Sequence, residues 1–119
     1  MKEVISLLLK PNENPIELKV NYEDEFELNR LLACKSTYSV NKVVGTKMYL
    51  FTIDNDMETE KSEVVGVNEN TLQYIKGNIL ISNLNHKSLS KDDIHNLLDN
   101  YINSFHSNFP HKCIVYKND

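Results

Sequence analysis

The sequence has few residues of the kinds that build common cofactor and membrane motifs. It contains only three glycines, Gly45, Gly66 and Gly77, so it can form neither a GxGxxG nor a GxxxxGK phosphate-binding loop. No apolar run approaches the roughly 20 residues that a membrane-spanning helix needs. The start, MKEVISLLLKP, shows no small-residue cleavage site after its short apolar run. We therefore expect no signal peptide and a cytoplasmic location.

Cysteines and basic residues are also scarce. The two cysteines, Cys34 and Cys113, are far apart and form no CxxC pair, which predicts free, buried thiols rather than a disulfide. The 13 Lys and Arg residues are outnumbered by 17 Asp and Glu residues, and they form no basic stripe. We therefore expect no direct binding of nucleic acid and no membrane partner.

The acidic excess falls in the first half of the chain. Residues 1–60 hold seven basic and eleven acidic residues, whereas residues 61–119 hold six of each. Four carboxylates of the EDEFE segment form a candidate partner-binding patch: Glu23, Asp24, Glu25 and Glu27. The alternative interpretation is that they are solvated residues at the start of a helix, where the helix dipole favours negative charge.

Hydrophobic periodicity predicts a single α+β domain over residues 1–119. Strand patterns occur in EVISLLLK, IELKVNY, TYSVNKVV, TKMYLFTI, KSEVVGVN and NILISNL, and short turns between them favour a mainly antiparallel sheet. The segment EDEFELNRLLACK changes to a helical period and predicts a short helix over about residues 24–35. The segment HKCIVYK adds a candidate edge strand.

A longer amphipathic helix is predicted at the C-terminal side, over about residues 91–106. Ser90 and Asp93 have the spacing of a reciprocal N-terminal capping box. Six apolar residues follow at the helical spacing i, i+3, i+4, i+7, i+8 and i+11: Ile94, Leu97, Leu98, Tyr101, Ile102 and Phe105. This stripe needs a cover, which is either the sheet or a second copy of the chain in a homodimer.

Few residues suggest chemistry. His95 and Asp99 are i,i+4 neighbours on the predicted helix, which indicates either an oriented base or metal ligand, or a surface pair. Three candidate metal ligands fall within the segment FHSNFPHKC: His106, His111 and Cys113. Their H-x4-H-x-C spacing is not a zinc-ribbon pattern and lacks a fourth ligand, so we predict no cofactor.

Aromatic residues on the predicted strands offer a further candidate surface. Tyr38, Tyr49, Phe51 and Tyr74 lie on or next to these strands, where one face of the sheet is core. A residue on the other face would present its ring to a partner, because exposed aromatic side chains favour binding surfaces.

Four segments occur in a recognisable order: the opening ISLLLKPNENPIELKV, the helix EFELNRLLACK, the Gly-centred strand YIKGNILISNL and the closing SLSKDDIHNLL. In this order, over roughly residues 4–100, they resemble a small family of unknown function that is common in bacteriophages and mobile elements. The chain departs from the family pattern after the helix, where KSTYSV replaces a Gly-Gly-Tyr-like turn. It also lacks the arginine of an Asn-Arg pair before the late strand. The resemblance implies an accessory protein that acts on host or rival machinery, and it transfers no catalytic residue.

These observations together predict a non-enzymatic binding protein of phage or mobile-element type, located in the cytoplasm of the host cell. It would inhibit a bacterial defence system, either by occluding the surface of a bacterial protein or by sequestering a small ligand. Two alternatives stay open. One is an immunity protein or antitoxin that neutralises a cognate toxin. The other is a small metal-dependent enzyme that uses His95, Asp99, His106 or His111.

Overall fold

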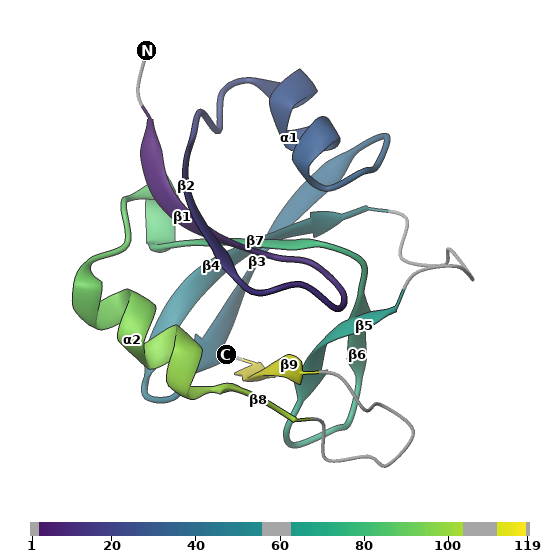
Figure 1. Cartoon of the computed structure of the whole chain (residues 1–119), viewed down its shortest axis with the longest axis vertical. Coiled ribbons are helices and arrows are strands. Elements are labelled where there is room, and N and C mark those ends of the chain that lie inside the picture. Colours follow the sequence, from purple (N-terminus) through teal and green to yellow (C-terminus); the bar gives the residue numbers. More distant parts are fainter. Residues whose placement is uncertain (1–2, 56–62, 104–111, 119) are drawn as a thin grey trace.

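The structure, a computed structural model, describes residues 3–55, 63–103 and 112–118 (Figure 1). The strands are β1 Val4–Leu9, β2 Ile16–Val20, β3 Thr37–Val44, β4 Lys47–Asp54, β5 Val64–Asn68, β6 Tyr74–Lys76, β7 Ile79–Ser82, β8 Tyr101–Asn103 and β9 Lys112–Asn118. The helices of these ranges are α1 Glu25–Leu31 and α2 Lys91–Asp99, with a 3-10 turn, η1, at Leu84–His86. In these ranges the strands form one sheet in the order β2-β1-β7-β4-β3-β9-β5-β6, and β8 pairs with β9.

Strands β1 and β7 are buried on both faces, because the sheet separates two clusters of core side chains. In β1, Leu7 and Leu9 face the larger cluster, whereas Leu8 faces the smaller one. In β7, Ile79 and Ile81 face the larger cluster, whereas Leu80 faces the smaller one. Burial on both faces explains why these strands read as continuous apolar runs rather than as alternating ones.

Helix α1 covers the smaller cluster and ends at Leu31, four residues before the predicted end at about residue 35. Ala33 adopts a left-handed conformation with φ of 51°, and its N–H donates to the carbonyl oxygen of Arg30. The N–H of Cys34 donates to the carbonyl oxygen of Asn29, which completes a Schellman motif. Glycine usually occupies the position that Ala33 takes, so the true end of α1 carries no clear sequence signal.

The predicted α+β fold, a mainly antiparallel sheet packed by a long helix over residues 91–106, is wrong. The sheet is mixed, because β5 and β9 run parallel, and α2 ends at Asp99. After Asn100 the chain enters β8, where Tyr101 pairs with Ile114 of β9. The carbonyl oxygen of Asn100 accepts from the N–H of Val115 at 2.9 Å, so β9 binds backbone groups that a longer helix would have used internally.

The apolar stripe of the predicted helix therefore divides between two elements. Leu97 on α2 is fully buried, but the next residue, Leu98, is 43% exposed. In β8, Tyr101 is buried and Ile102 is 39% exposed, as expected for the alternating faces of a strand. Phe105 lies outside the described residues. Within the described ranges, no helix is both long enough and apolar enough to cross a membrane.

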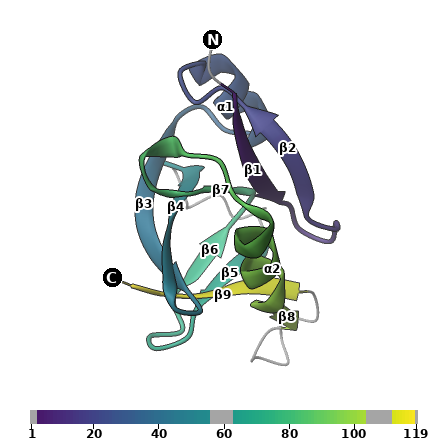
Figure 2. The same ribbon diagram turned by 90° about the vertical axis from the view of Figure 1, so that its left-hand side faces the viewer.

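The hairpin of β3 and β4 positions side chains for the site described below. A two-residue turn closes it, and Gly45 in that turn has a φ of 66°, the positive value that a type II′ turn needs at its first central position. The pairing continues along all eight residues of β3. Alternation then places Tyr38, Val40 and Lys42 on the same inner face as the buried Val44. Figure 2 shows β3 at the left-hand margin of the molecule, with β4 beside it.

Candidate functional site

An open pocket of about 420 Å³ lies between the inner face of β3 and strands β6 and β9. This volume is within the range of small-ligand sites. The described residues that line it are three tyrosines, a lysine, a glutamine and three apolar residues: Tyr38, Tyr74, Tyr116, Lys42, Gln73, Val40, Ile53 and Ile75. Tyr38 and Tyr74 are 37% and 36% exposed, so parts of their rings are accessible, whereas Tyr116 is buried. We call this hollow the tyrosine pocket.

Lys42 supplies the positive charge of the tyrosine pocket. Its Nζ donates to Oδ1 of Asn118 at 2.6 Å and lies 5.2 Å from the centre of the Tyr116 ring. Among the residues that the structure describes, no carboxylate lies within ion-pair distance of this ammonium. Burial lowers the pKa of Lys42 from its ordinary value. A bound anion would favour the charged form of Lys42 and would be attracted by it in return.

Tyr116 forms a rigid, uncharged wall of the pocket. Burial raises its pKa to about 12, with a further contribution from Tyr38, so its hydroxyl keeps its proton at neutral pH. Its ring packs edge-on against Phe51, with 5.7 Å between the ring centres. The described lining includes no Ser, Cys, His, Asp or Glu. The groups present there act by stacking, by charge and by hydrogen bonding, which are the interactions of a binding site.

The predicted acidic patch lies at the start of α1, where part of it has a structural role. Oδ1 of Asp24 accepts from the N–H of Glu27 at 3.1 Å and thereby caps the helix. Glu23, Asp24 and Glu25 are exposed, and Glu27 is half-buried. Phe26 lies within this patch and is 81% exposed, which leaves a large apolar side chain among carboxylates.

Of the three predicted metal ligands, only Cys113 lies in the described part of the chain. His106 and His111 fall outside it. Cys113 is buried in β9 against Val64 and Val67, and burial raises its pKa to about 11, which disfavours the thiolate that zinc binds. Neither cysteine forms a disulfide. Within the described ranges, no group of three or more His, Cys, Asp and Glu side chains is placed to hold a metal.

The two described histidines lie away from the tyrosine pocket. His95 and Asp99 are both exposed on α2. His86, which no sequence pattern indicated, stacks on Tyr22 with 4.3 Å between the ring centres. Its Nδ1 is buried and has no hydrogen-bond partner among the described residues, and burial lowers its pKa. The ring of His86 is thus held against Tyr22, and His86 does not line the tyrosine pocket.

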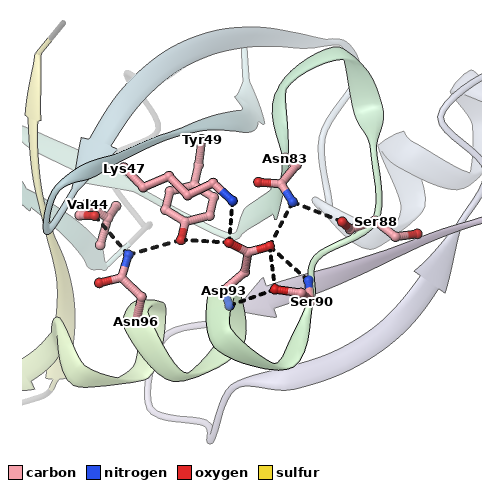
Figure 3. Close-up of polar contacts among 8 residues, drawn as sticks. All are labelled: Val44, Lys47, Tyr49, Asn83, Ser88, Ser90, Asp93 and Asn96. Atoms are coloured by element: carbon pink, nitrogen blue, oxygen red, sulfur yellow. Dashed lines mark hydrogen bonds and ion pairs between the residues drawn. The ribbon is translucent and has the colours of Figure 1, made fainter.

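A buried polar network joins α2 to β4 and to the loop after β7 (Figure 3). Asp93 is its centre and is only 4% exposed. One carboxylate oxygen accepts from Nζ of Lys47 and from the Tyr49 hydroxyl, and the other accepts from Nδ2 of Asn83 and from the N–H of Ser90. The capping box predicted for Ser90 and Asp93 is confirmed. The partners from other elements were not predicted.

The charge state of Asp93 makes this network sensitive to acid. Burial by itself would raise the pKa of Asp93, but hydrogen bonds from Lys47, Ser90 and Asn83 outweigh it and hold the pKa well below its ordinary value. The folded protein therefore binds this proton more weakly than the unfolded chain does. The resulting stabilisation is present above the unfolded-state pKa, near 3.8, and is lost as the pH falls below it.

We expect this loss of stabilisation at low pH to appear when the wild type is compared with Asp93→Asn, whose side chain cannot ionise. The difference in unfolding free energy between the two proteins should be constant from about pH 7 to about pH 5 and should shrink below about pH 4. Urea unfolding at a series of pH values measures it. A difference that stays the same from pH 5 to pH 3 would show that Asp93 is not held ionised by its partners.

No protein-family model, curated protein or solved structure matches the chain. The functional argument therefore depends on the chemistry of the described residues, and the tyrosine pocket is the feature with the most distinctive chemistry.

Proposed function

We propose that the protein is a non-enzymatic binding protein that captures a planar, negatively charged group in the tyrosine pocket. The observation that supports this most is the position of Lys42, which lies beside the Tyr116 ring without a carboxylate partner among the described residues. A planar group can stack on the accessible rings of Tyr38 and Tyr74, while its anionic end accepts a hydrogen bond from Lys42.

The captured group belongs either to a small molecule that is sequestered or to a bacterial protein whose surface is occluded. The setting we propose is the one that the sequence resemblance implies, namely inhibition of a bacterial defence system by a phage or mobile-element protein in the host cytoplasm. Native mass spectrometry of protein purified gently from cells would detect a retained small molecule directly.

We expect indole-3-acetate to bind in the tyrosine pocket and Lys42→Ala to weaken that binding about tenfold. A hydrogen bond to a charged group contributes about 1.5 kcal/mol, which corresponds to roughly a factor of ten in the dissociation constant. An NMR titration measures this, and the amides of Tyr38, Gln73 and Tyr74 should shift most.

Two controls make the titration specific to the pocket charge. Lys19→Ala removes an exposed lysine from β2, four strands away in the sheet, and should leave the affinity unchanged. Uncharged indole should bind the wild type more weakly than indole-3-acetate does. Chemical shifts that are spread elsewhere on the protein, or equal affinities for Lys42→Ala and the wild type, would refute the proposed site.

A second candidate function is favoured by the exposure of Phe26. An apolar side chain among carboxylates suits a partner with an apolar cleft edged by basic residues, such as a toxin bound by an immunity protein or antitoxin. Phe26→Ala should then weaken capture of the cognate toxin at least tenfold, whereas Leu98→Ala, at an exposed position of α2, should not. Charge reversal at Glu23 and Glu25 tests the acidic part without removing the Asp24 cap.

A further inference from the structure

We infer that the edge of β3 beside the tyrosine pocket is the docking site for an extended acidic peptide segment of a partner protein. This inference rests on the proposed function, because the peptide segment is the source we assign to the planar, negatively charged group that the tyrosine pocket captures. It begins from the pairing of β3. Strand β4 borders all eight residues of β3, but on the other side β9 borders only Lys42 and Val43. In the described part of the chain, no strand pairs with that other side of Thr37–Asn41, at the margin seen in Figure 2.

The hairpin register determines which backbone groups point away from β4. In a two-residue hairpin the closing pair, here Val44 and Lys47, exchanges both hydrogen bonds, and alternate residues then turn to opposite sides. By this alternation, Ser39 and Asn41 direct their N–H and C=O groups outward. Val43 has the same phase, and it is one of the residues at which β9 pairs with β3. The outward groups of Ser39 and Asn41 are thus oriented to continue the sheet.

The segment Thr37–Asn41 also lacks the features that usually prevent exposed edges from pairing. Its sequence, TYSVN, contains no charged residue, no proline and no glycine. By contrast, the edge strand β2 carries Glu17 and Lys19, which are both exposed, and the edge strand β6 has only three residues. Of these edges, that of β3 is the one most open to an added strand.

The pocket specifies the side chains of the added strand. In a strand whose middle residue pairs with Ser39, the two neighbouring residues lie opposite Tyr38 and Val40 and point to the inner face, into the tyrosine pocket. The residue opposite Val40 is diagonal to Lys42, within reach of a long charged side chain, so Asp or Glu there would pair with the ammonium. The residue opposite Tyr38 meets an aromatic ring, which favours an aromatic side chain. The occupant is therefore an extended segment with an aromatic and an acidic residue two positions apart.

The test is a selection from a library of random heptapeptides displayed on phage, with the full chain as the target. The best-enriched peptide is then synthesised and titrated. We expect enriched peptides to carry an acidic and an aromatic residue two positions apart, and Ser39→Pro to weaken binding at least tenfold. Proline removes the outward N–H of Ser39 and leaves the bonds between β3 and β4 in place, as it can on an edge strand.

The matched control is Ser39→Ala, which should retain wild-type affinity within twofold. Both variants lose the hydroxyl that lies 2.9 Å from Oγ1 of Thr52, but only the alanine variant keeps the N–H. If Ser39→Pro does not fold, the same bond is tested on the wild type with a peptide that is N-methylated at one position at a time. Binding should then be weakened only by methylation at every second position of the peptide, because only alternate N–H groups of an added strand point toward β3.

Four results would overturn the inference, and together they distinguish three conclusions. The first is that no peptide is enriched beyond the level found with an unrelated target protein, while Lys42-dependent binding of indole-3-acetate persists. In that case the tyrosine pocket is a binding site, but the edge of β3 does not dock a peptide strand. If the binding of indole-3-acetate is also absent, the proposed function is refuted as well. Equal peptide binding by the two Ser39 variants, or a dimer that Ser39→Pro dissociates in native mass spectrometry, would exclude a foreign strand at this edge.

Discussion

Replacing Asp93 with alanine is expected to lower the free energy of unfolding by about 3 kcal/mol. The reason is that the substitution removes the acceptor for several groups at once. Loss of the reciprocal cap with Ser90 costs about 1 kcal/mol. The buried hydroxyl of Tyr49 also loses an acceptor, and an unsatisfied buried group costs about 1–3 kcal/mol. The half-buried amide of Asn83 adds less, because it keeps its bond to the carbonyl oxygen of Ser88. Lys47 adds little, because its side chain is 50% exposed and is rehydrated when the carboxylate is absent.

Urea unfolding followed by circular dichroism measures this effect, and an unchanged dependence on urea concentration would show that the folded state stays compact. Asp92→Ala is the matched control. Asp92 lies in the same first turn of α2 but is exposed, so its loss removes only a helix-dipole interaction of at most about 1 kcal/mol. If the two variants differ by less than about 1 kcal/mol, the bonds from Tyr49 and Asn83 do not stabilise the fold.

Asp93 also shows what local sequence can and cannot predict. The capping box was predictable, because Ser90 and Asp93 are three residues apart and the helix geometry brings them together. Lys47 and Tyr49 lie 46 and 44 residues away, and only the sheet topology places them beside α2. No sequence spacing encodes that distance, so the tertiary part of the network could not be predicted.

The end of α2 could not be predicted for a different reason. Tyr101 and Ile102 continue the helical spacing of apolar residues. They fit a strand equally well, in which adjacent residues point to opposite faces, one buried and one exposed. What decides between them is β9, more than ten residues later, which pairs with β8. Tertiary pairing therefore overrides a local pattern that is consistent with both states.

The candidate site was predictable only in its aromatic part. Tyr38 and Tyr74 could be selected because aromatic residues on strands are candidates for exposure, and both are partly exposed. Lys42 could not be selected from the sequence. A lysine in a strand of alternating apolar and polar residues is expected on the solvent-exposed face rather than beside a buried tyrosine. The predicted acidic patch does not line the tyrosine pocket, and neither does Cys113, the one predicted metal ligand among the described residues.

Leu97→Ala is expected to destabilise the fold by about 2–5 kcal/mol, whereas Leu98→Ala should cost less than about 1 kcal/mol. Leu97 is fully buried in the larger cluster, so its truncation leaves a cavity against the sheet. Leu98, its neighbour in sequence, is 43% exposed, and its side chain is already partly hydrated. The two variants remove the same atoms from the same helix, so their difference in urea unfolding reports burial alone.

The same pair of variants distinguishes the two descriptions of this segment. In a helix over residues 91–106 packed through its whole apolar stripe, Leu97 and Leu98 would both face the cover, and the two truncations would cost similar amounts. In the observed fold, α2 is only nine residues long and Leu97 is its one fully buried apolar residue, with Ile94 partly buried beside the cluster. Nearly equal losses would mean that a second surface, such as another copy of the chain, covers Leu98 in solution. A large difference would show that α2 is held to the sheet through Leu97 on one side and the Asp93 network on the other.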